Sequence, residues 1–303
     1  MDHARDVLHM INQFRSEMPT PIVGIGHSFG ANSLVNVALM HPRLLSTLVL
    51  LDPVIQEYAS SPTGPNPVRL STFRRDFWPS RAEAEDAMRK QKYYQSWDPR
   101  VLDRWLQFGL RDTPSPLYPD KSGVTLTTTK HQECFTFMRP SWDGLSEDGN
   151  TLLNRDLVPD MCMDNPIKYP LYRPEPPNTL VRLGELRPSV LYLFGETSNM
   201  SPPRFRNQKM ETTGMGVGGS GGAKAGRVKE ILMEGLGHLV AMEAPGKCAE
   251  EAGNWLGREV QRFAKERESY QEWTKRSLAS KSTMSEEWKK RIGGPLKAPK
   301  GKL

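Results

Sequence analysis

A Gly-x-Ser-x-Gly pentapeptide between an apolar strand and a helix constrains this sequence more than any other feature. The strand is predicted over residues 22–25, the pentapeptide occupies residues 26–30, and residues 31–40 have the composition of a buried helix. Glycines two positions before and after Ser28 permit a tight turn that lifts the serine Oγ above a sheet. In such a turn the N–H of Phe29 faces an oxyanion that develops beside the serine. The pattern therefore predicts a nucleophilic serine with a backbone oxyanion donor.

The other apolar segments predict a parallel sheet whose strands alternate with helices. Continuous apolar runs occupy residues 44–51, 189–194 and 228–233, and a helical pattern follows over about 244–266. Strands that are apolar on both faces are typical of a parallel sheet covered by helices on both sides. Helical spacing also predicts a first helix over residues 2–18, ahead of the serine strand. The expected fold class is therefore α/β, with a mostly parallel sheet.

The middle of the chain does not follow this alternation. Between residues 54 and 187 the sequence is rich in aromatic residues and prolines and contains two helical patches. Because this stretch is too long for a connecting loop, we expect an inserted helical cap. The expected organisation is a first core part over residues 1–53, the cap over 54–187, a second core part over 188–268 and a basic tail over 269–303.

The net charge of +6 is concentrated near the end of the chain. Residues 257–303 carry 13 Lys and Arg against 6 Asp and Glu, whereas the preceding residues carry 28 against 29. A near-neutral body with a basic tail does not indicate nucleic-acid binding. No apolar run reaches the ~18–20 residues of a membrane span, and residues 1–13 lack a signal-peptide stretch. Three widely spaced cysteines predict neither a disulfide framework nor a metal site, so no cofactor is expected.

His238 is the predicted base for Ser28, because a serine hydroxyl is a poor nucleophile at neutral pH without one. It lies in Gly-Leu-Gly-His-Leu, after the last apolar strand and before the final helix. That position predicts a histidine at the carboxyl edge of the sheet, close to the serine. His27 is next to Ser28 in the sequence, but we expect its side chain to point elsewhere.

Two acidic residues compete for the place beside His238. In this architecture the acid most often follows the strand before the last one, where residues 195–198 read Gly-Glu-Thr-Ser and serine stands at the usual aspartate position. Asp52 ends the strand after the nucleophile helix, at the same edge of the sheet, and is within reach of the same imidazole. We choose Asp52 and keep Glu196 as the main rival. The order Ser28, Asp52, His238 is the serine–acid–histidine order of such hydrolases.

These landmarks resemble the α/β-hydrolase superfamily. Gly-His-Ser-Phe-Gly, Leu-Leu-Asp-Pro and Gly-Leu-Gly-His-Leu-Val-Ala-Met-Glu-Ala-Pro match it between Pro21 and about Ala264. The cap phrases Arg-Arg-Asp-Phe-Trp-Pro-Ser from Arg74 and Tyr-Gln-Ser-Trp-Asp-Pro-Arg from Tyr94 resemble fungal peroxisomal hydrolases of secondary-metabolite and toxin pathways. Within that subgroup the sequence resembles the type I acyl-CoA thioesterases of mycophenolic acid biosynthesis. The subgroup takes its acid from the earlier strand, which independently favours Asp52.

The residues and the resemblance together imply the expected chemistry. Ser28 would attack an acyl carbonyl, His238 would take and return the proton, and Asp52 would orient the imidazole. The resemblance implies a thioesterase that hydrolyses a hydrophobic acyl-CoA to free acid and CoA, with the acyl chain under the cap. A carboxylesterase or lipase is the rival enzyme, and an inactive hydrolase-fold binding protein is the rival from another class.

The two ends of the sequence carry further expectations. Gly301-Lys302-Leu303 resembles the Ser-Lys-Leu address, which predicts a peroxisomal matrix location and the import receptor as a partner. A homodimer is left open. Family members begin with several strands before the nucleophile strand and take a second oxyanion N–H from a loop there, whereas this chain starts on the helix before residues 22–25. We therefore expect a shortened N-terminus and an unpaired sheet edge.

Overall fold

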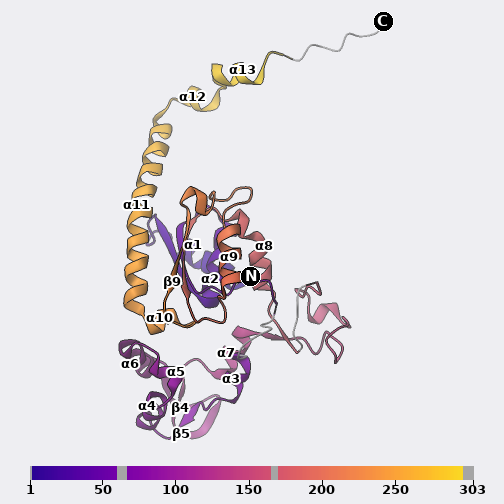
Figure 1. The fold of residues 1–303 in the computed structure, drawn as a ribbon, viewed down its shortest axis with the longest axis vertical. Helices are drawn as coiled ribbons and strands as arrows, with labels where there is room; N and C mark the ends of the chain where they lie inside the picture. The colour runs from indigo at the N-terminus through magenta and orange to yellow at the C-terminus, as the bar shows by residue number, and fades with distance from the viewer. Residues whose placement is uncertain (1, 60–66, 165–169, 296–303) are drawn as a thin grey trace. The chain divides into compact units, whose positions relative to one another are not determined.

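The computed structural model describes residues 2–59, 67–164 and 170–295 of the chain (Figure 1). Contacts within the chain divide it into two compact units, Met1–Gly257 and Arg258–Leu303. In the described ranges no helix is both long enough and apolar enough to cross a membrane.

A four-stranded parallel sheet forms the core of the first unit. Its strands, in spatial order, are β1 (Ile22–His27), β2 (Leu45–Leu51), β8 (Ser189–Gly195) and β9 (Val228–Met233). All three neighbouring pairs are parallel. Because parallel strands run in the same direction, the residues that follow them meet at one edge of the sheet. The expectation of a mostly parallel sheet is confirmed.

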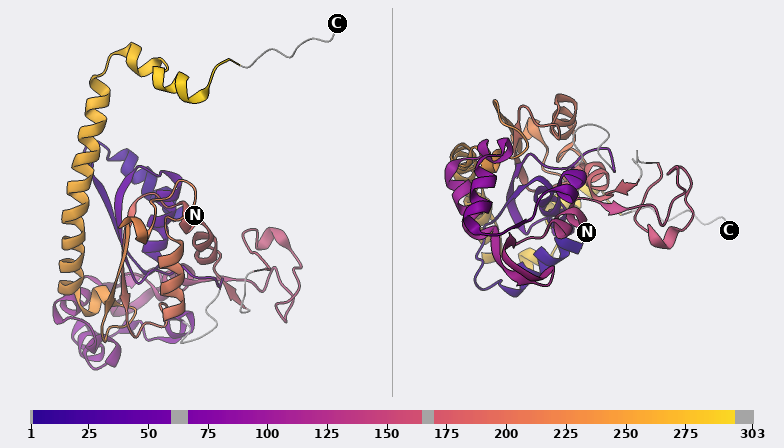
Figure 2. Two further views of the ribbon diagram at one scale, coloured as in Figure 1. Left: turned by 45° about the horizontal axis from the view of Figure 1, so that its top comes forward. Right: turned by 90° about the horizontal axis from the view of Figure 1, so that it is seen from below.

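Helices cover both faces of this sheet (Figures 1 and 2). They are α1 (Asp2–Gln13), α2 (Ser28–Met40), α8 (Glu175–Arg182), α9 (Pro203–Thr212), α10 (Val240–Glu243) and α11 (Pro245–Lys275). Leu48 and Leu50 of β2 face a core shared with α1, α2 and α8, whereas Val49 and Leu51 face a core shared with α10 and α11. Burial on both faces explains why the strand is a continuous apolar run.

The first helix is shorter than its apolar spacing predicts. The expected helix extends to residue 18, but α1 ends at Gln13. The next residues form a turn in which the N–H groups of Glu17 and Met18 both donate to the carbonyl of Phe14. The turn brings the chain to the start of β1.

Strand β1 lies at the edge of the sheet in the described part of the chain. It pairs with β2 along one side, and the side chain of Ile25 is 56% exposed. An edge strand presents backbone N–H and C=O groups that pair with no neighbouring strand. The strand that leads into Ser28 is therefore supported from one side.

The segment between β2 and α8 contains strands as well as helices. Its elements are α3 (Pro67–Phe73), β3 (Phe77–Trp78), α4 (Arg81–Arg89), α5 (Lys92–Gln95), α6 (Pro99–Phe108), β4 (Leu110–Ser115), β5 (Tyr118–Leu126), α7 (Lys130–Phe137), β6 (Arg139–Pro140), the 3-10 turn η1 (Arg155–Leu157) and β7 (Leu171–Tyr172). The strands β3, β5 and β4 form an antiparallel sheet. The expectation of a helical cap missed this sheet, because most of β5 is exposed and only residues 124–126 are buried. A short apolar run gives little period-two signal.

An aromatic and aliphatic core holds this segment together and packs against the chain that follows His238. The core comprises Trp78, Ala84, Met88, Tyr94, Trp97, Leu102, Leu106, Leu110, Val124 and Leu126. Leu239, which directly follows His238 in the chain, and Met242 of α10 pack against it. The backbone N–H of Asp98 also donates to the carbonyl of Met242 at 2.8 Å. The segment therefore contacts the stretch of chain that carries the predicted base.

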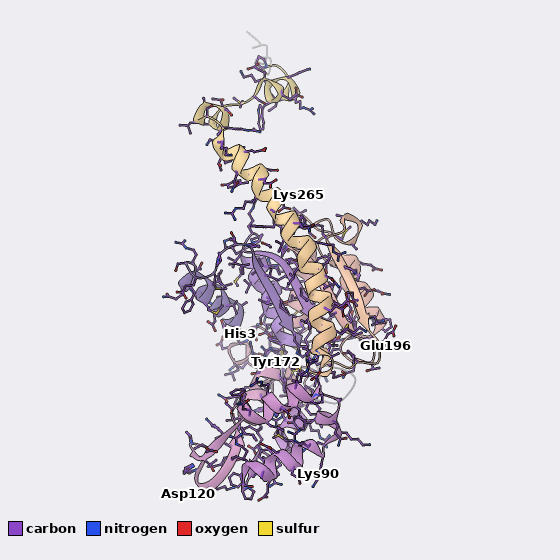
Figure 3. All side chains as sticks on the ribbon, turned by 90° about the vertical axis from the view of Figure 1, so that its left-hand side faces the viewer. His3, Lys90, Asp120, Tyr172, Glu196 and Lys265 are labelled. Carbon is purple, nitrogen blue, oxygen red and sulfur yellow. The ribbon has the colours of Figure 1, made fainter. Side chains whose placement is uncertain are left out.

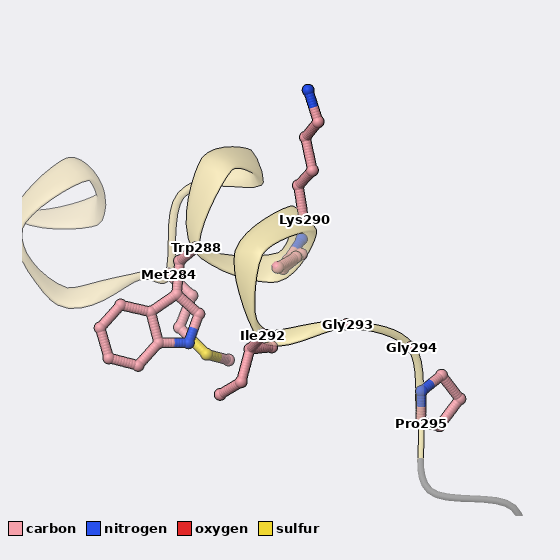
Figure 4. Close-up of a pocket in the computed structure, with 8 residues that line it drawn as sticks. Met284, Trp288, Lys290, Ile292, Gly293, Gly294 and Pro295 are labelled. Carbon is pink, nitrogen blue, oxygen red and sulfur yellow. The ribbon is translucent and has the colours of Figure 1, made fainter.

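The second unit contains the last part of α11 and the short helices α12 (Leu278–Ser282) and α13 (Glu286–Ile292). Ser277 and Ser285 cap α12 and α13 through hydrogen bonds from the N–H groups of Ser280 and Trp288. A surface hollow beside α13 is lined on its apolar side by Met284, Trp288 and Ile292 (Figure 4).

Candidate active site

The turn between β1 and α2 presents Ser28 at the first position of α2. Ser28 has a φ of 55°, a left-handed conformation that serine rarely adopts. A Cβ at Gly26 would lie 2.8 Å from the backbone nitrogen of Ala31, so the turn requires glycine there. A Cβ at Gly30 would have nothing within 4 Å. Of the two glycines of the pentapeptide, the close approach therefore depends on the first.

His238 bridges Ser28 and Asp52. Its Nε2 is 2.9 Å from the Ser28 Oγ, and its Nδ1 is 2.6 Å from the Asp52 Oδ2. The Asp52 side chain is fully buried, whereas the imidazole is 23% exposed. A carboxylate that accepts from Nδ1–H leaves the Nε2 lone pair directed at the serine hydroxyl. The structure thus brings together the three residues that the sequence selected.

Further donors hold the Asp52 carboxylate. The backbone N–H of Gly195 donates to Oδ1 at 3.2 Å, and the hydroxyl of Ser198 donates to Oδ2 at 2.5 Å. Together with His238 Nδ1 they satisfy a buried carboxylate that has no access to water. Sequence reasoning treated Ser198 as a departure from the usual acid position and did not foresee that its hydroxyl would bind the acid.

Glu196, the rival acid, has a different partner. Its Oε2 accepts a hydrogen bond from the backbone N–H of Gly235 at 2.8 Å. The residue is exposed, as its labelled position in Figure 3 illustrates. Because Asp52 already occupies Nδ1 of His238, this geometry favours Asp52 as the residue that orients the imidazole.

Three side chains from different elements hold the loop that carries His238. Glu196 binds the N–H of Gly235, and the Glu243 Oε2 accepts from the N–H of Gly237 at 2.9 Å. His27 donates from Nε2 to the carbonyl of His238 at 2.8 Å. The sequence did not predict this contact, in which the ring centroid of His27 lies 5.0 Å from that of His238. Only spatial proximity across the sheet edge reveals this contact.

Burial determines the charge preference of His27. Desolvation lowers the pKa of its imidazole, and the neighbouring His238 adds to the decrease, although the bond to the backbone carbonyl opposes both. A neutral His27 keeps one N–H for the His238 carbonyl. The loop is thus held without a second positive charge beside the predicted base.

The first turn of α2 supplies the predicted oxyanion donor. The N–H groups at the start of a helix have no intrahelical acceptor, so that of Phe29 is available to a ligand. The Arg173 guanidinium lies 4.0 Å from the centroid of the Phe29 ring. Arg173 is in turn paired with Glu175 at 2.9 Å. This stack fixes the ring, while the role of the Phe29 N–H remains a prediction.

A polar cavity of about 390 Å³ lies beside Phe29, between the starts of α1 and α2 and the β6–β7 region. Its charged lining includes Arg139, Arg173 and Glu175. Glu175 accepts from both arginines at 2.9 Å and Asp160 also pairs with Arg139, so the two positive charges face two carboxylates.

A lysine with no expected role is buried on the first unit's α9. Lys209 is fully buried, and its Nζ donates to the carbonyl of Phe205 at 3.3 Å. Burial lowers the pKa of its ammonium group to about 8, and the charge of Asp52 partly opposes this decrease. No sequence pattern predicts its burial, because a single lysine in a polar helix is usually exposed.

Residues 1–251 match the Alpha/beta hydrolase family. The chain belongs to this family. The expectation of a hydrolase of this fold is thereby confirmed, and the parallel sheet and the strand-to-helix turn at Ser28 are those of an α/β hydrolase.

Within the α/β hydrolases, the chain is similar to several curated fungal proteins. The chain is 37% identical over 327 residues to the type I acyl-CoA thioesterase mpaH of Penicillium roqueforti, covering 100% of this chain and 73% of the relative. It is 39% identical over 332 residues to mpaH of Penicillium brevicompactum, covering 100% and 74%. The abhydrolase domain-containing protein AKT2 of Alternaria alternata is 27% identical, covering 92% and 100%. The resemblance to fungal type I acyl-CoA thioesterases is thereby confirmed.

A solved structure shows the same fold. The peroxisomal α/β-hydrolase Lpx1 of Saccharomyces cerevisiae aligns with a TM-score of 0.58 at 18% identity, covering 95% of this chain and 65% of that one. At this identity the similarity concerns the fold alone.

Proposed function

We propose that this α/β hydrolase is an acyl-CoA thioesterase that converts a hydrophobic acyl-CoA to a free carboxylic acid and CoA. The proposal is carried by the hydrogen-bonded chain from Ser28 through His238 to Asp52. Such a chain generates a nucleophile for acyl transfer. The thioester class is supported by relatives that are named type I acyl-CoA thioesterases and are 37–39% identical.

In the proposed acylation step, Ser28 Oγ attacks the thioester carbonyl carbon and His238 Nε2 accepts the hydroxyl proton. The N–H of Phe29 donates to the oxyanion of the tetrahedral intermediate. When the intermediate collapses, the carbon–sulfur bond breaks and the sulfur takes the proton from His238. CoA leaves as the thiol, and the acyl group remains as an ester on Ser28.

In the proposed deacylation step, water replaces CoA. His238 accepts a proton from the water as its oxygen attacks the acyl carbon, and then returns that proton to Ser28 Oγ as the ester bond breaks. Asp52, hydrogen-bonded to Nδ1, stabilises the imidazolium that forms in both steps. The products are a carboxylic acid and the free serine.

The cap supports a hydrophobic acyl group. Its aromatic core packs against Leu239 and Met242, immediately after His238 in the chain. Tyr94, Trp97 and Trp105 lie with ring centroids 5.2–6.5 Å apart in this core. This aromatic core makes the surroundings of the proposed acyl-transfer site apolar, which favours a hydrophobic acyl group.

The thioester assignment is tested by incubating the purified chain with a panel of acyl-CoAs and following free thiol, with p-nitrophenyl esters assayed in parallel. We expect higher kcat/KM for an acyl-CoA than for the esters and loss of thiol release in Ser28→Ala. Ser269→Ala, in an exposed part of α11, is the matched control and should retain activity. Preference for the esters would instead assign a carboxylesterase, and a folded chain inactive on both would assign a binding protein.

We also propose the peroxisomal matrix as the location, with the import receptor as partner. This proposal depends on Gly301, Lys302 and Leu303, which lie outside the described residues. A fluorescent reporter followed by residues 294–303 should gather in peroxisomes of a fungal cell. The same reporter with Leu303→Glu should stay diffuse, and equal distribution of the two reporters would contradict the proposal.

A further inference from the structure

The second unit exposes a small apolar face on and before α13. Trp288 and Ile292 are four residues apart and therefore lie on one side of the helix, and Met284 precedes it on the same side (Figure 4). Their exposed fractions are 56% for Trp288, 72% for Ile292 and 65% for Met284. Large apolar side chains gathered in this way mark an interaction surface. We call these three residues the α13 apolar face.

Basic residues flank this face. Lys289 directly follows Trp288, and Arg291 directly precedes Ile292. The Lys290 side chain points away from the face (Figure 4). Lys289 pairs with Glu286 at 2.7 Å and Arg291 with Glu287 at 2.6 Å, which places the acidic residues of α13 beside cations. The result is an apolar centre bordered by two ion pairs, on a helix that carries three cations against two carboxylates. An apolar face beside an excess of cations is typical of helices that lie in a membrane interface.

The same character extends along the tail. Residues 273–295 carry six Lys and Arg against two Asp and Glu. Trp273 and Leu278 are also exposed, so aromatic and aliphatic side chains recur between the cations. Tryptophan is favoured at bilayer interfaces, where its ring is apolar and its N–H remains accessible to water.

Charge decides which occupant fits the α13 apolar face. A second copy of the chain would place its own basic tail against the first one, and the two sets of positive charges would repel each other. A helix of seven residues also offers far less apolar area than the ~1,200 Å² of a small specific protein interface. A negatively charged lipid surface accepts the cations and the apolar side chains together.

We propose that the tail, over residues 273–295, binds the surface of an anionic phospholipid bilayer. Trp288, Ile292 and Met284 enter the boundary between headgroups and acyl chains, while Lys289, Lys290 and Arg291 remain among the lipid phosphates. The tail lies on the surface and does not span the bilayer, in keeping with the absence of a spanning helix in the described ranges. This inference does not depend on the proposed hydrolytic activity.

Vesicle co-sedimentation of the full chain tests the proposal. We expect binding to phosphatidylcholine vesicles that contain about 30% phosphatidylserine, and at least tenfold weaker binding to phosphatidylcholine alone. Raising NaCl to about 0.5 M should also weaken it, because salt screens the attraction. Absence of binding to the anionic vesicles, or equal binding to both kinds, would overturn the proposal.

Two variants separate the apolar and the charged contributions. Trp288→Ala/Ile292→Ala removes apolar contacts, and Lys289→Gln/Lys290→Gln/Arg291→Gln removes charges; each should weaken binding roughly tenfold. The matched control, Leu153→Ala/Val181→Ala, removes two exposed aliphatic side chains from the first unit and should bind like the wild type. Unchanged binding of both tail variants would contradict the assignment of the lipid contact to α13.

Sedimentation velocity distinguishes a lipid surface from a second copy. The proposal predicts that the wild type and Trp288→Ala/Ile292→Ala have the same oligomeric state without vesicles. If the wild type were a dimer and this variant a monomer, the α13 apolar face would belong to a dimer interface and the lipid proposal would be wrong.

Discussion

Ser28 and Asp52 occupy matching positions on adjacent strands. Each follows the last residue of its strand, and those last residues, His27 and Leu51, are paired in the parallel register of β1 and β2. In the described part of the chain, Ser28 and Asp52 are also the non-glycine residues with positive φ, 55° and 42°. Left-handed geometry at such residues costs about 1–3 kcal/mol each, and it turns both side chains toward His238.

If Asp52 rather than Glu196 orients His238, two isosteric substitutions should have very different effects on kcat. Asp52→Asn should lower kcat by about three to four orders of magnitude, because an amide cannot stabilise the imidazolium and selects the wrong tautomer. Glu196→Gln should stay within a few-fold of the wild type, since its carboxylate binds the N–H of Gly235. The measurement is the kcat of both variants on the same acyl-CoA. A larger loss of kcat in Glu196→Gln than in Asp52→Asn would instead identify Glu196 as the residue that orients His238.

Ser198 is predicted to position the acid. Ser198→Ala removes the donor to Asp52 Oδ2 and should reduce kcat/KM roughly tenfold, the effect of about 1.4 kcal/mol at a charged acceptor. Ser198→Thr retains a hydroxyl and should recover most of the activity. In the Asp52→Asn background the alanine substitution should have a smaller effect, because the charged acceptor is already gone. Additive losses in this double-mutant cycle would contradict the coupling.

His27 should make stability depend on mildly acidic pH. Its folded pKa lies below the unfolded value of 6.5, so the unfolded chain binds more protons between these two values. The contribution of His27 to stability is complete above pH 6.5 and is lost as the pH falls through its folded pKa. Urea unfolding of the wild type and His27→Gln at pH 7.5 and 5.5 measures this. The wild type should lose more stability than the variant, and parallel losses would refute the assignment.

Lys209, whose pKa is also lowered by burial, should already reduce the free energy of unfolding at neutral pH, because it is still charged there. Its folded pKa of about 8 lies below the unfolded value of 10.5, so keeping it charged and buried costs roughly 3 kcal/mol at pH 7. Lys209→Met should therefore raise the free energy of unfolding at pH 7, and the gain should shrink as the pH rises from 8 to 10.5. Chemical denaturation across this range is the measurement. If Lys209→Met were instead less stable than the wild type at pH 7, the contacts of the ammonium group would stabilise the fold by more than the burial of its charge costs.

The sequence predicted the parts of the site that follow from strand order. Ser28 and Asp52 directly follow their strands and His238 lies in the loop after β9, and parallel strands bring their carboxyl ends to one edge. Ser198, His27 and Glu243 were missed because each acts through a single hydrogen bond that carries no periodic pattern. The strands β4 and β5 were missed for a related reason, since their exposed residues and prolines hide the alternation.

The edge position of β1 has a consequence for local opening of the sheet. Strands β2 and β8 each have neighbours on both sides, whereas β1 is hydrogen-bonded along one side in the described chain. Amide hydrogens in β1 should therefore exchange with solvent faster than those of Leu191 and Leu193, which lie in the sheet interior. The predicted nucleophile thus sits at the end of one of the two edge strands in the described sheet, while the residue that orients its base is attached to an interior strand.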